Sequence, residues 1–479
     1  MSSAPALVWF RDDLRLADNP ALHAAQRSDR PLVLLYLLDE ESEGIRRLGG
    51  AARWWLGRAL ASLAEAIEAE GGRLVLRRGK ASEVVPAVAL EAKASAIYWN
   101  RRYGASEIAV DTALKAELTA RGLAVESFSG SLLHEPWTVK TQSGGPFKVF
   151  GPFYRNASQH DIRRPAGAGN HWQFAKAPTG DKLASWKLEP TMPDWAGGLR
   201  ESWTPGEDGG RAALAAFVDG GLRGYAAGRD RPDMEHTSRL SPYLRFGHVS
   251  PQQLLAAVRH AADAGEVPGA DVEKFVRELY WREFSYHLLF HFPDLAQVNF
   301  NRRFDGFEWN SDAGLARAWR HGLTGYPLID AGMRQLWQTG WMHNRVRMVA
   351  ASFLIKHALV DWRHGEDWFW DTLVDADPAN NAASWQWVAG SGADAAPYFR
   401  IFNPVTQGEK FDPHGAYVRR FVPELARLPD TSIHKPWKAS PQVLAQAGVR
   451  LGETYPHPIV DHAAARQRAL ARYQRIRGD

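Results

Sequence analysis

The stretch Leu-Val-Leu-Leu-Tyr-Leu-Leu, residues 32–38, places seven apolar side chains in a row, which is typical of a β-strand inside a sheet. Four further short apolar runs share this character, at residues 6–10, 74–76, 96–99 and 124–128. Segments with apolar side chains at helical spacing separate these runs, at residues 52–70, 82–92 and 106–121. Strands that alternate with helices predict an α/β fold with a doubly wound parallel sheet over residues 4–130.

The rest of the chain changes character twice. Residues 131–205 are rich in Gly, Pro and Trp and show weak periodicity, so we expect a long connector over the surface. Residues 206–479 show mostly helical periodicity, with helices expected at 211–220, 250–264, 272–291 (with Asp271 as its N-cap), 315–320, 326–339, 341–359, 366–374 and 462–475. The predicted architecture is an α/β domain (4–130), a connector (131–205) and a larger all-helical domain (206–479).

Composition excludes several classes of site. The sequence contains no Cys, which excludes disulfides, thiolate-ligated zinc, Cys nucleophiles and cysteine-held iron–sulfur clusters. No window approaches 18 consecutive apolar residues, and the first residues lack the pattern of a signal peptide, so we expect a cytoplasmic protein without a membrane span. The net charge of +4 permits a nucleic-acid partner but does not require one.

A polar stretch near the C-terminal third suits a flat, hydrogen-bonding ring. Residues 375–387 read Asp-Ala-Asp-Pro-Ala-Asn-Asn-Ala-Ala-Ser-Trp-Gln-Trp, with two acids, two adjacent amides and two tryptophans. Ten of the 20 tryptophans lie between Trp281 and Trp387, a density that favours stacking or electron-transfer roles although core packing explains most aromatics. A redox-active flavin fits this combination.

Two helical patterns place unusual side chains on one face. Asn344, Arg347 and Met348 stand at i, i+3 and i+4, and Arg347 could pair with Asp375 or Asp377, either in a functional site or as a structural ion pair. Glu278, Trp281 and Arg282 have the same spacing. That second face suits a stacked base and a phosphate, or an ordinary amphipathic helix with its tryptophan in the core.

Two weaker patterns also carry alternatives. The loop 237–241, Thr-Ser-Arg-Leu-Ser, offers hydroxyls and a guanidinium to a phosphate, or is simply the N-cap of a helix. His287 and His291 have the i, i+4 spacing that zinc can use, but no third ligand is evident, so we predict no metal site.

Taken together, these motifs resemble the DNA photolyase/cryptochrome family. The match runs through Val8-Trp-Phe-Arg-Asp-Asp-Leu-Arg15, Thr237–Ser241, Trp281-Arg-Glu-Phe284, Thr324-Gly-Tyr-Pro327, residues 341–348 and 375–387, Phe402-Asn-Pro404 and Gln407-Gly-Glu-Lys-Phe411. It covers nearly the whole chain. Residues 99–103 and 143–146 look most like the bacterial class III photolyases, which repair cyclobutane pyrimidine dimers.

The resemblance implies a bound FAD and a role for each matching residue. Asp375 and Asp377 would face the polar edge of the flavin ring, Arg347 would neutralise Asp375, and Asn381 would face flavin N5. The remaining residues that would contact FAD are Tyr225, Thr237, Ser238, Arg239, Leu240, Ser241, Phe275 and Arg282. Trp385, Trp362 and Trp309 match the chain that carries an electron from the surface to photoexcited oxidised flavin.

The resemblance also implies contacts to damaged DNA. A dimer flipped out of the duplex would stack on Trp281 and Trp387, while Glu278 and Asn344 hydrogen-bond it and Met348 packs against it. Arg229, Arg345 and Gln407 would contact the DNA strand. Light would excite reduced FAD, an electron would pass to the dimer, and the cyclobutane ring would split. We expect the protein to act as a monomer.

The resemblance also bears on the antenna chromophore and on which kind of family member the protein is. The class resemblance favours methenyltetrahydrofolate as antenna, with Glu107 as a ligand, and deazaflavin is the alternative. A (6-4) photolyase would be expected to have histidines in place of Asn344 and Met348. A cryptochrome, a blue-light signalling protein, tends to lose the tryptophans that stack on the substrate. Cyclobutane dimers are therefore the expected substrate.

Overall fold

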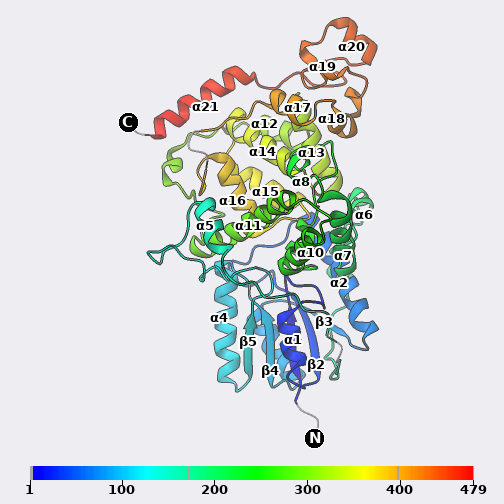
Figure 1. Cartoon of the computed structure of the whole chain (residues 1–479), viewed down its shortest axis with the longest axis vertical. Helices are drawn as coiled ribbons and strands as arrows, with labels where there is room; N and C mark the ends of the chain where they lie inside the picture. The colour runs from blue at the N-terminus through cyan, green and yellow to red at the C-terminus, as the bar shows by residue number, and fades with distance from the viewer. Residues whose placement is uncertain (1–3, 170–171, 396–398, 478–479) are drawn as a thin grey trace. The chain divides into compact units, whose positions relative to one another are not determined.

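The N-terminal part of the chain is a parallel five-stranded sheet, in a computed structural model that describes residues 4–169, 172–395 and 399–477. The strand order is β3-β2-β1-β4-β5, as in one half of a doubly wound nucleotide-binding fold (Figure 1). The strands are β1 (Ala6–Phe10), β2 (Leu32–Leu38), β3 (Leu74–Arg78), β4 (Ala96–Asn100) and β5 (Ala124–Phe128). The predicted sheet is confirmed, and β3 and β4 run slightly further than their apolar runs.

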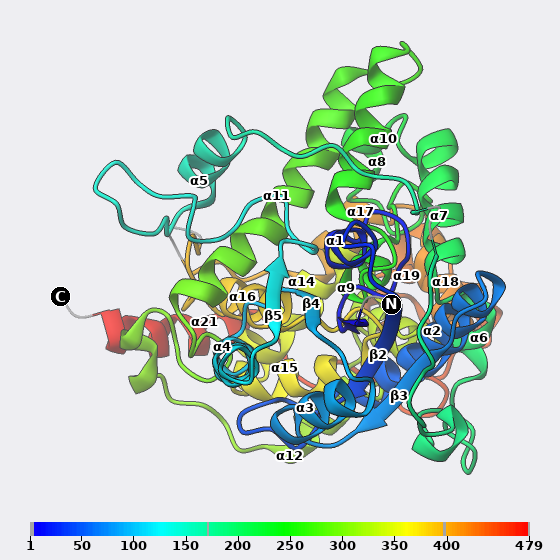
Figure 2. The same ribbon diagram turned by 90° about the horizontal axis from the view of Figure 1, so that it is seen from below.

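Helices cover both faces of this sheet. Figure 2 shows α1 on one side of the strands and α3 and α4 on the other. Val85 and Val88 of α3 and Leu114 of α4 are buried in one cluster with Trp9 and Leu35 of the sheet. The helices of this region are α1 (Pro20–Gln26), α2 (Gly50–Ala69), α3 (Ala81–Glu91) and α4 (Ala105–Ala120). Strands buried on both faces explain the continuous apolar runs in the sequence.

The connector is less irregular than its composition indicated. It contains α5 (Phe150–Ala157), a 3₁₀ turn at Leu183–Trp186 and α6 (Gly197–Ser202). Residue Phe174 forms an isolated parallel bridge with Leu32 of β2. Aromatic side chains anchor α5, since Phe150 and Phe153 are buried. Hydrophobic periodicity does not predict α5, because its eight residues make too few helical turns for a repeat to be recognised.

The remainder of the described chain is helical, as predicted. Its longer helices are α7 (Glu207–Ala216), α10 (Pro251–Asp263), α11 (Gly269–His291), α12 (Ala313–Arg320), α13 (Pro327–Thr339), α14 (Asn344–Ser352), α15 (Trp362–Thr372), α16 (Pro378–Ala389), α17 (Pro404–Phe411) and α21 (His462–Arg477). Shorter helices are α8 (Tyr225–Gly228), α9 (Ser241–Arg245), α18 (Ala416–Phe421), α19 (Asp430–Ile433) and α20 (Pro441–Ala447). No helix among the described residues is both long and apolar enough to cross a membrane.

Several predicted helix boundaries are wrong. The helix expected at 211–220 is α7 (Glu207–Ala216), and the helix expected at 366–374 is α15 (Trp362–Thr372). The helix expected at 341–359 starts only at Asn344, because the His343 side chain caps it by accepting from the Arg345 backbone N–H. It then widens into a π-helical turn at Phe353–His357. Asp271 is not an N-cap but lies in the first turn of α11, which follows Pro268. Caps depend on backbone angles that periodicity does not report.

The chain divides into two compact units. One unit comprises Met1–Arg223 and Ser238–Pro293, and the other comprises Gly224–Thr237 and Asp294–Asp479. The boundary expected near residue 206 therefore falls inside the first unit. The helices α7, α10 and α11 belong with the sheet, because the chain returns to the first unit after residue 237.

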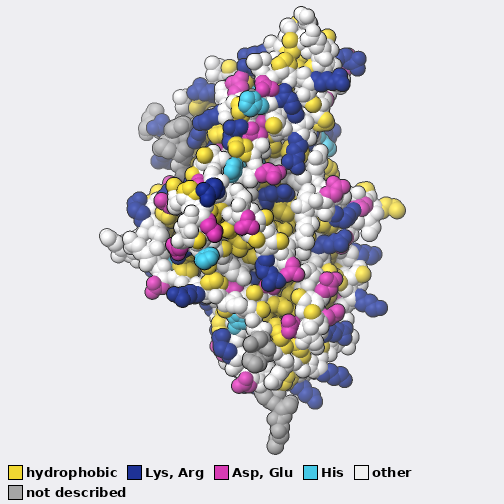
Figure 3. All heavy atoms as spheres, turned by 45° about the vertical axis from the view of Figure 1, so that its right-hand side comes forward, with side chains coloured by type: hydrophobic (Ala, Val, Ile, Leu, Met, Phe, Trp, Pro, Cys, Tyr) yellow, Lys and Arg dark blue, Asp and Glu magenta, His cyan; other side chains and the backbone are white. Residues whose placement is uncertain are grey.

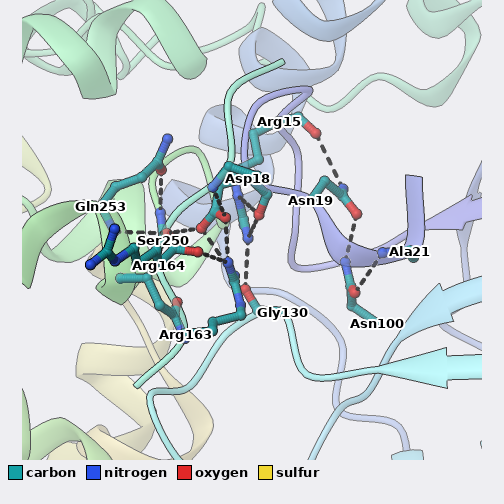
Figure 4. A network of polar contacts seen from close by, with 12 residues as sticks. Arg15, Asp18, Asn19, Ala21, Asn100, Gly130, Arg163, Arg164, Ser250 and Gln253 are labelled. Atoms are coloured by element: carbon teal, nitrogen blue, oxygen red, sulfur yellow. Dashed lines mark hydrogen bonds and ion pairs between the residues drawn. The ribbon is translucent and has the colours of Figure 1, made fainter. Parts of the chain in front are cut away.

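A buried polar network ties together distant segments of the first unit (Figure 4). The Arg15 guanidinium, 0% exposed, donates to the carbonyls of Asp18 (2.8 Å) and Gly130 (2.7 Å). The Asp18 carboxylate in turn accepts from Arg163 and from the hydroxyl of Ser250. These bonds offset the cost of burying both charges and join the loop after β1, the connector and the start of α10.

Candidate functional site

The acidic start of α16 is built as a helix cap. The Asp377 carboxylate accepts from the backbone N–H groups of Ala379 (3.0 Å) and Asn380 (2.7 Å), and Pro378 occupies the first helical position. Acceptors and proline are favoured there because the first N–H groups of a helix lack partners within it. The sequence Asp-Pro therefore fixes where α16 begins, and it places Asn381 on the first turn.

Arg347 of α14 pairs with Asp375, one of the two acids suggested by the sequence. Its Nη2 donates to both carboxylate oxygens, at 2.8 and 3.1 Å, and its Nε donates to the Met342 carbonyl at 2.7 Å. The Asp375 side chain is only 3% exposed, whereas Arg347 is 25% exposed. These contacts confirm the predicted pairing of Arg347 with Asp375. A buried carboxylate needs such a partner, and the resulting pair presents a fixed polar group.

The Asn381 amide is held in one orientation. Its Nδ2 donates to the backbone carbonyl of Glu366 (3.0 Å) and to that residue's Oε1 (2.8 Å). Glu366 lies on α15, which runs beside α16 (Figure 1). Because both amide protons are used, Asn381 presents its carbonyl oxygen as an acceptor. The sequence does not indicate that Glu366 contacts Asn381, since the two residues are 15 positions apart.

The three predicted electron-transfer tryptophans belong to one hydrophobic cluster. Trp385 and Trp362 are buried members, and Trp309 packs against the cluster while partly exposed. Trp385 contacts Phe369 at 4.9 Å between ring centroids, and Gly365 leaves room for it, since a Cβ there would lie 2.1 Å from the indole. The Trp362 Nε1 donates to the Asn299 side chain.

The side chains proposed to hold the lesion are spread over the ends of two helices in the second unit. Asn344 is exposed on the first turn of α14, and Met348 follows one turn later, partly buried. Trp387 lies on the last turn of α16, with its Nε1 donating to the Asp394 carbonyl at 3.0 Å. Met348 and Trp387 both pack against the same hydrophobic cluster, while each keeps part of its surface exposed.

The other proposed lesion contacts lie on α11 in the first unit. One face of Trp281 stacks on Phe150 of α5, with centroids 3.7 Å apart and planes 7° from parallel. The Trp281 side chain is partly buried. Glu278 lies 3.5 Å from Lys274 on the same helix, and the Arg282 guanidinium donates to the Ser131 carbonyl at 2.8 Å.

The proposed phosphate loop is divided between the units. In the first, Arg239 has a left-handed backbone (φ 51°) and lies 4.4 Å over the Trp203 ring. Such a conformation in a residue other than glycine is uncommon and is often found at ligand sites. Phe275, also in the first unit, packs on Phe217 at 4.8 Å. In the second unit, Tyr225 is buried at the start of α8, and Thr237 ends the segment Gly224–Thr237.

The proposed DNA-contacting cations cluster in the second unit. The Arg345 Nη2 lies 2.9 Å from the Asp230 carboxylate, and Arg229 Nη1 lies 3.6 Å from it. The Arg345 guanidinium also covers the Phe411 ring at 4.4 Å. Gln407 precedes Phe411 by one helical turn on α17, so the two share a face. No local pattern singles out Asp230, because its neighbours Arg229 and Arg231 are basic.

The residues considered for an antenna or a metal have structural partners. Glu107 lies in the first turn of α4 and interacts electrostatically with Arg102, which pairs with Asp111 at 2.9 Å. The His287 ring accepts from the Phe147 backbone N–H and contacts the Pro136 carbonyl. No group of three metal-binding side chains occurs among residues 4–169, 172–395 and 399–477.

The chain is similar to known proteins in both sequence and structure. Family models match residues 6–168 ("DNA photolyase") and 275–475 ("FAD binding domain of DNA photolyase"). A deoxyribodipyrimidine photo-lyase of Agrobacterium fabrum is 53% identical, over 100% of this chain and 99% of its own length. The crystal structure of a class III photolyase from Agrobacterium tumefaciens, 52% identical, superposes with a TM-score of 0.96 over 100% of this chain and 98% of that one.

The chain belongs to the DNA photolyase/cryptochrome family. Two cryptochromes are also similar, but less so. Cryptochrome-1 of Arabidopsis thaliana is 39% identical over 97% of this chain and 70% of its own length. A Synechocystis cryptochrome structure, 30% identical, gives a TM-score of 0.87 over 99% of this chain. Within the family, this chain is therefore more similar to the Agrobacterium photolyases than to either cryptochrome.

Proposed function

We propose that the protein repairs cyclobutane pyrimidine dimers in DNA in a light-driven reaction with FAD. The observation that carries the proposal is the similarity of the chain, over its whole length, to a photo-lyase. Each unit also has a partly exposed tryptophan, Trp281 in the first and Trp387 in the second. An exposed aromatic side chain suits an unstacked base, which binds by its face. Asn344 and Met348, instead of two histidines, favour cyclobutane dimers over (6-4) lesions.

The residues present fit FAD. Asp375 offers a carboxylate whose charge Arg347 offsets, and Asn381 offers an acceptor oxygen fixed by Glu366. Such preset groups bind a polar ring edge without first reorganising. We propose Tyr225, Thr237–Ser241, Phe275 and Arg282 as further residues that contact FAD, and the Asp375 side chain is 3% exposed. When bound and reduced, FAD supplies the photoexcited electron that opens the cyclobutane ring.

We assign the protein's own residues to substrate binding and electron supply. Trp281 and Trp387 stack on the flipped bases, Glu278 and Asn344 hydrogen-bond them, and Met348 fills the space beside them. Flipping costs least where base pairing is already damaged, which favours lesions. Arg229, Arg345 and Gln407 hold the strand. Basic and acidic side chains intermix over one face (Figure 3), so local clusters and not the net charge attract DNA.

The tryptophans suit reductive activation of oxidised flavin. Trp385 and Trp362 are buried, and Trp309 is partly exposed, so the cluster passes from core towards solvent. We propose that this order lets an external donor refill the outermost tryptophan. The side chains need no acid–base chemistry for this role.

The proposal also covers the domains, the antenna chromophore, the compartment and the oligomeric state. We propose residues 4–130 as the antenna-binding domain, 131–205 as a connector and 206–479 as the FAD- and DNA-binding region. Methenyltetrahydrofolate is the antenna we propose, with Glu107 as a ligand and deazaflavin as the alternative. The absence of Cys supports a cytoplasmic protein, and we propose that it acts as a monomer.

One experiment separates this function from a cryptochrome role and from (6-4) repair. Reduced holoprotein is mixed with DNA carrying cyclobutane thymine dimers, and recovery of thymine absorbance is followed with and without blue light. Light-dependent recovery on these dimers, but not on (6-4) lesions, is the expected result. No recovery despite bound, reduced FAD would favour a photoreceptor and reduce Trp281 and Trp387 to packing roles.

A further inference from the structure

An acidic side chain sits among the cations proposed to hold DNA. Asp230 follows α8 and lies 2.9 Å from Arg345 Nη2 and 3.6 Å from Arg229 Nη1. All three residues belong to the second unit. The Asp230 side chain is 35% exposed, whereas those of Arg345 and Arg229 are 14% and 11% exposed. The Asp230 side chain is thus the most exposed of the three, although its Oδ1, which faces Arg229, is buried.

The two guanidiniums are held in place without Asp230. Arg345 lies on the first turn of α14, and its guanidinium covers the Phe411 ring at 4.4 Å, with Lys410 5.1 Å from the same ring. The Arg229 guanidinium is 5.9 Å from the Tyr225 ring. An aromatic face restrains a guanidinium and leaves its edge available to an anion. The cations are therefore preset for an anion that bridges them.

His343, a titratable group close to these residues, does not add a charge near neutrality. Burial, with the nearby Arg229 contributing, lowers the pKa of His343 to about 4. Its ring is then neutral and accepts from the Arg345 backbone N–H, which is the role of an N-cap. The ion-pair contacts of this cluster join the guanidiniums of Arg345 and Arg229 to the Asp230 carboxylate.

A carboxylate and a phosphodiester present similar anionic oxygens to arginine. Both accept paired N–H donors from a guanidinium. We propose that Asp230 occupies the place of a DNA phosphate on Arg345 and Arg229, and that it competes with the DNA backbone for these cations. This inference rests on the proposed function, because it takes both arginines as DNA contacts.

The competition weakens binding to the backbone and speeds release. A phosphate that enters has to displace the Asp230 carboxylate or bind beside it, so each phosphate contact gains less than a free guanidinium would give. The carboxylate returns as the phosphate leaves, which favours dissociation of DNA that has already been repaired. Backbone contacts are indifferent to sequence and lesion, so the effect extends to undamaged DNA.

The test uses Asp230→Asn in the FAD-loaded full chain. Fluorescence anisotropy measures affinity for an undamaged duplex and for the same duplex with one thymine dimer, between 50 and 200 mM salt. We expect roughly fivefold tighter binding to both, as for the loss of one exposed charge contact. We also expect the slope of log affinity against log salt to steepen by about one unit, and dissociation to slow.

Matched variants exclude a general charge effect. Glu453→Gln removes the same charge from an exposed pair (66% exposed) outside this cluster and should leave affinity nearly unchanged. Asp230→Glu keeps the carboxylate and should bind as the parent does. FAD content and the unfolding temperature of each variant show that it is folded. Should Asp230→Asn misfold, Asp230→Ser is measured in its place.

Arg345→Gln separates the two hypotheses. If that variant binds DNA more weakly while Asp230→Asn binds no more tightly, the competitor role is wrong and the DNA-binding assignment stands. If Arg345→Gln leaves affinity for both duplexes unchanged, the DNA assignment of this cluster fails, and the Asp230 proposal fails with it. Equal tightening by Glu453→Gln and Asp230→Asn would reduce the effect to net charge.

Discussion

Removing Arg347 should destabilise the second unit and weaken FAD binding, because Asp375 is too buried to lose its guanidinium partner. Arg347→Met keeps most of the side-chain volume and removes the charge. Breaking a buried pair from one side costs about 3–5 kcal/mol, and the 25% exposure of Arg347 places this pair at the lower limit, about 3 kcal/mol. The lost bond from Nε to the Met342 carbonyl adds about 1 kcal/mol.

A double-mutant cycle isolates the pair. In Arg347→Met/Asp375→Asn the buried charge is gone, so the variant should recover about 2 kcal/mol relative to Arg347→Met, although the Met342 bond stays lost. Equilibrium urea unfolding of the holoprotein, followed by circular dichroism and by FAD release, gives both free energies. FAD affinity should fall in the single variant and recover only in part in the double variant, which lacks the carboxylate.

An exposed pair provides the control. Arg450 and Glu453 are 2.8 Å apart, with side chains 70% and 66% exposed. Arg450→Met should therefore cost less than about 1 kcal/mol and leave FAD binding unchanged. The reasoning would be refuted if Arg347→Met cost no more than Arg450→Met, or if the double variant were no more stable than Arg347→Met.

Three further predictions follow from single contacts. Trp281→Ala should weaken binding to dimer-containing DNA by about 1–3 kcal/mol while FAD content stays unchanged. A filter-binding or anisotropy assay measures this affinity. An affinity for the lesion equal to that of the parent would exclude stacking on Trp281. Asn381→Asp brings a second carboxylate against Glu366, where the amide now donates at 2.8 Å, so photoreduction and repair should slow; unchanged rates of both would contradict the N5 role. Burial raises the pKa of Glu283 to about 7, so the native state binds its proton more tightly than the unfolded state, and stability should fall by on the order of 3 kcal/mol as pH rises from about 4.5 to 7. In Glu283→Gln the free energy of unfolding, measured by urea unfolding across this pH range, should no longer fall. A pH profile of stability equal to that of the parent would show that Glu283 is not responsible for the fall.

Much of the architecture could be predicted from local pattern. The five apolar runs gave the strands of the sheet, since buried parallel strands need continuous hydrophobic side chains. Helices α13 and α15 began within four residues of their expected starts, with α13 one residue late and α15 four residues early. Helix α14 was wrong at both ends, because the His343 cap and the π-turn at Phe353–His357 depend on tertiary packing.

Parts of the candidate site were also accessible from local spacing. Asn344, Arg347 and Met348 share a face at i, i+3 and i+4, and the Asp-Pro pair marks the start of α16. The choice between Asp375 and Asp377 as the partner of Arg347 was not accessible. Helix capping occupies Asp377 Oδ1, and the fold brings Asp375 within 2.8 Å of the guanidinium.

The sequence by itself determined which chemical groups this protein carries and the order of its elements, because those depend on residue type and on periodicities of two and 3.6. The tertiary structure alone decided which groups meet. Glu366 orients Asn381 across 15 residues, Phe150 covers one face of Trp281 across 131 residues, and Asp230 reaches Arg345 across 115 residues. Contacts between segments far apart in the chain arise from packing, and no local pattern encodes them.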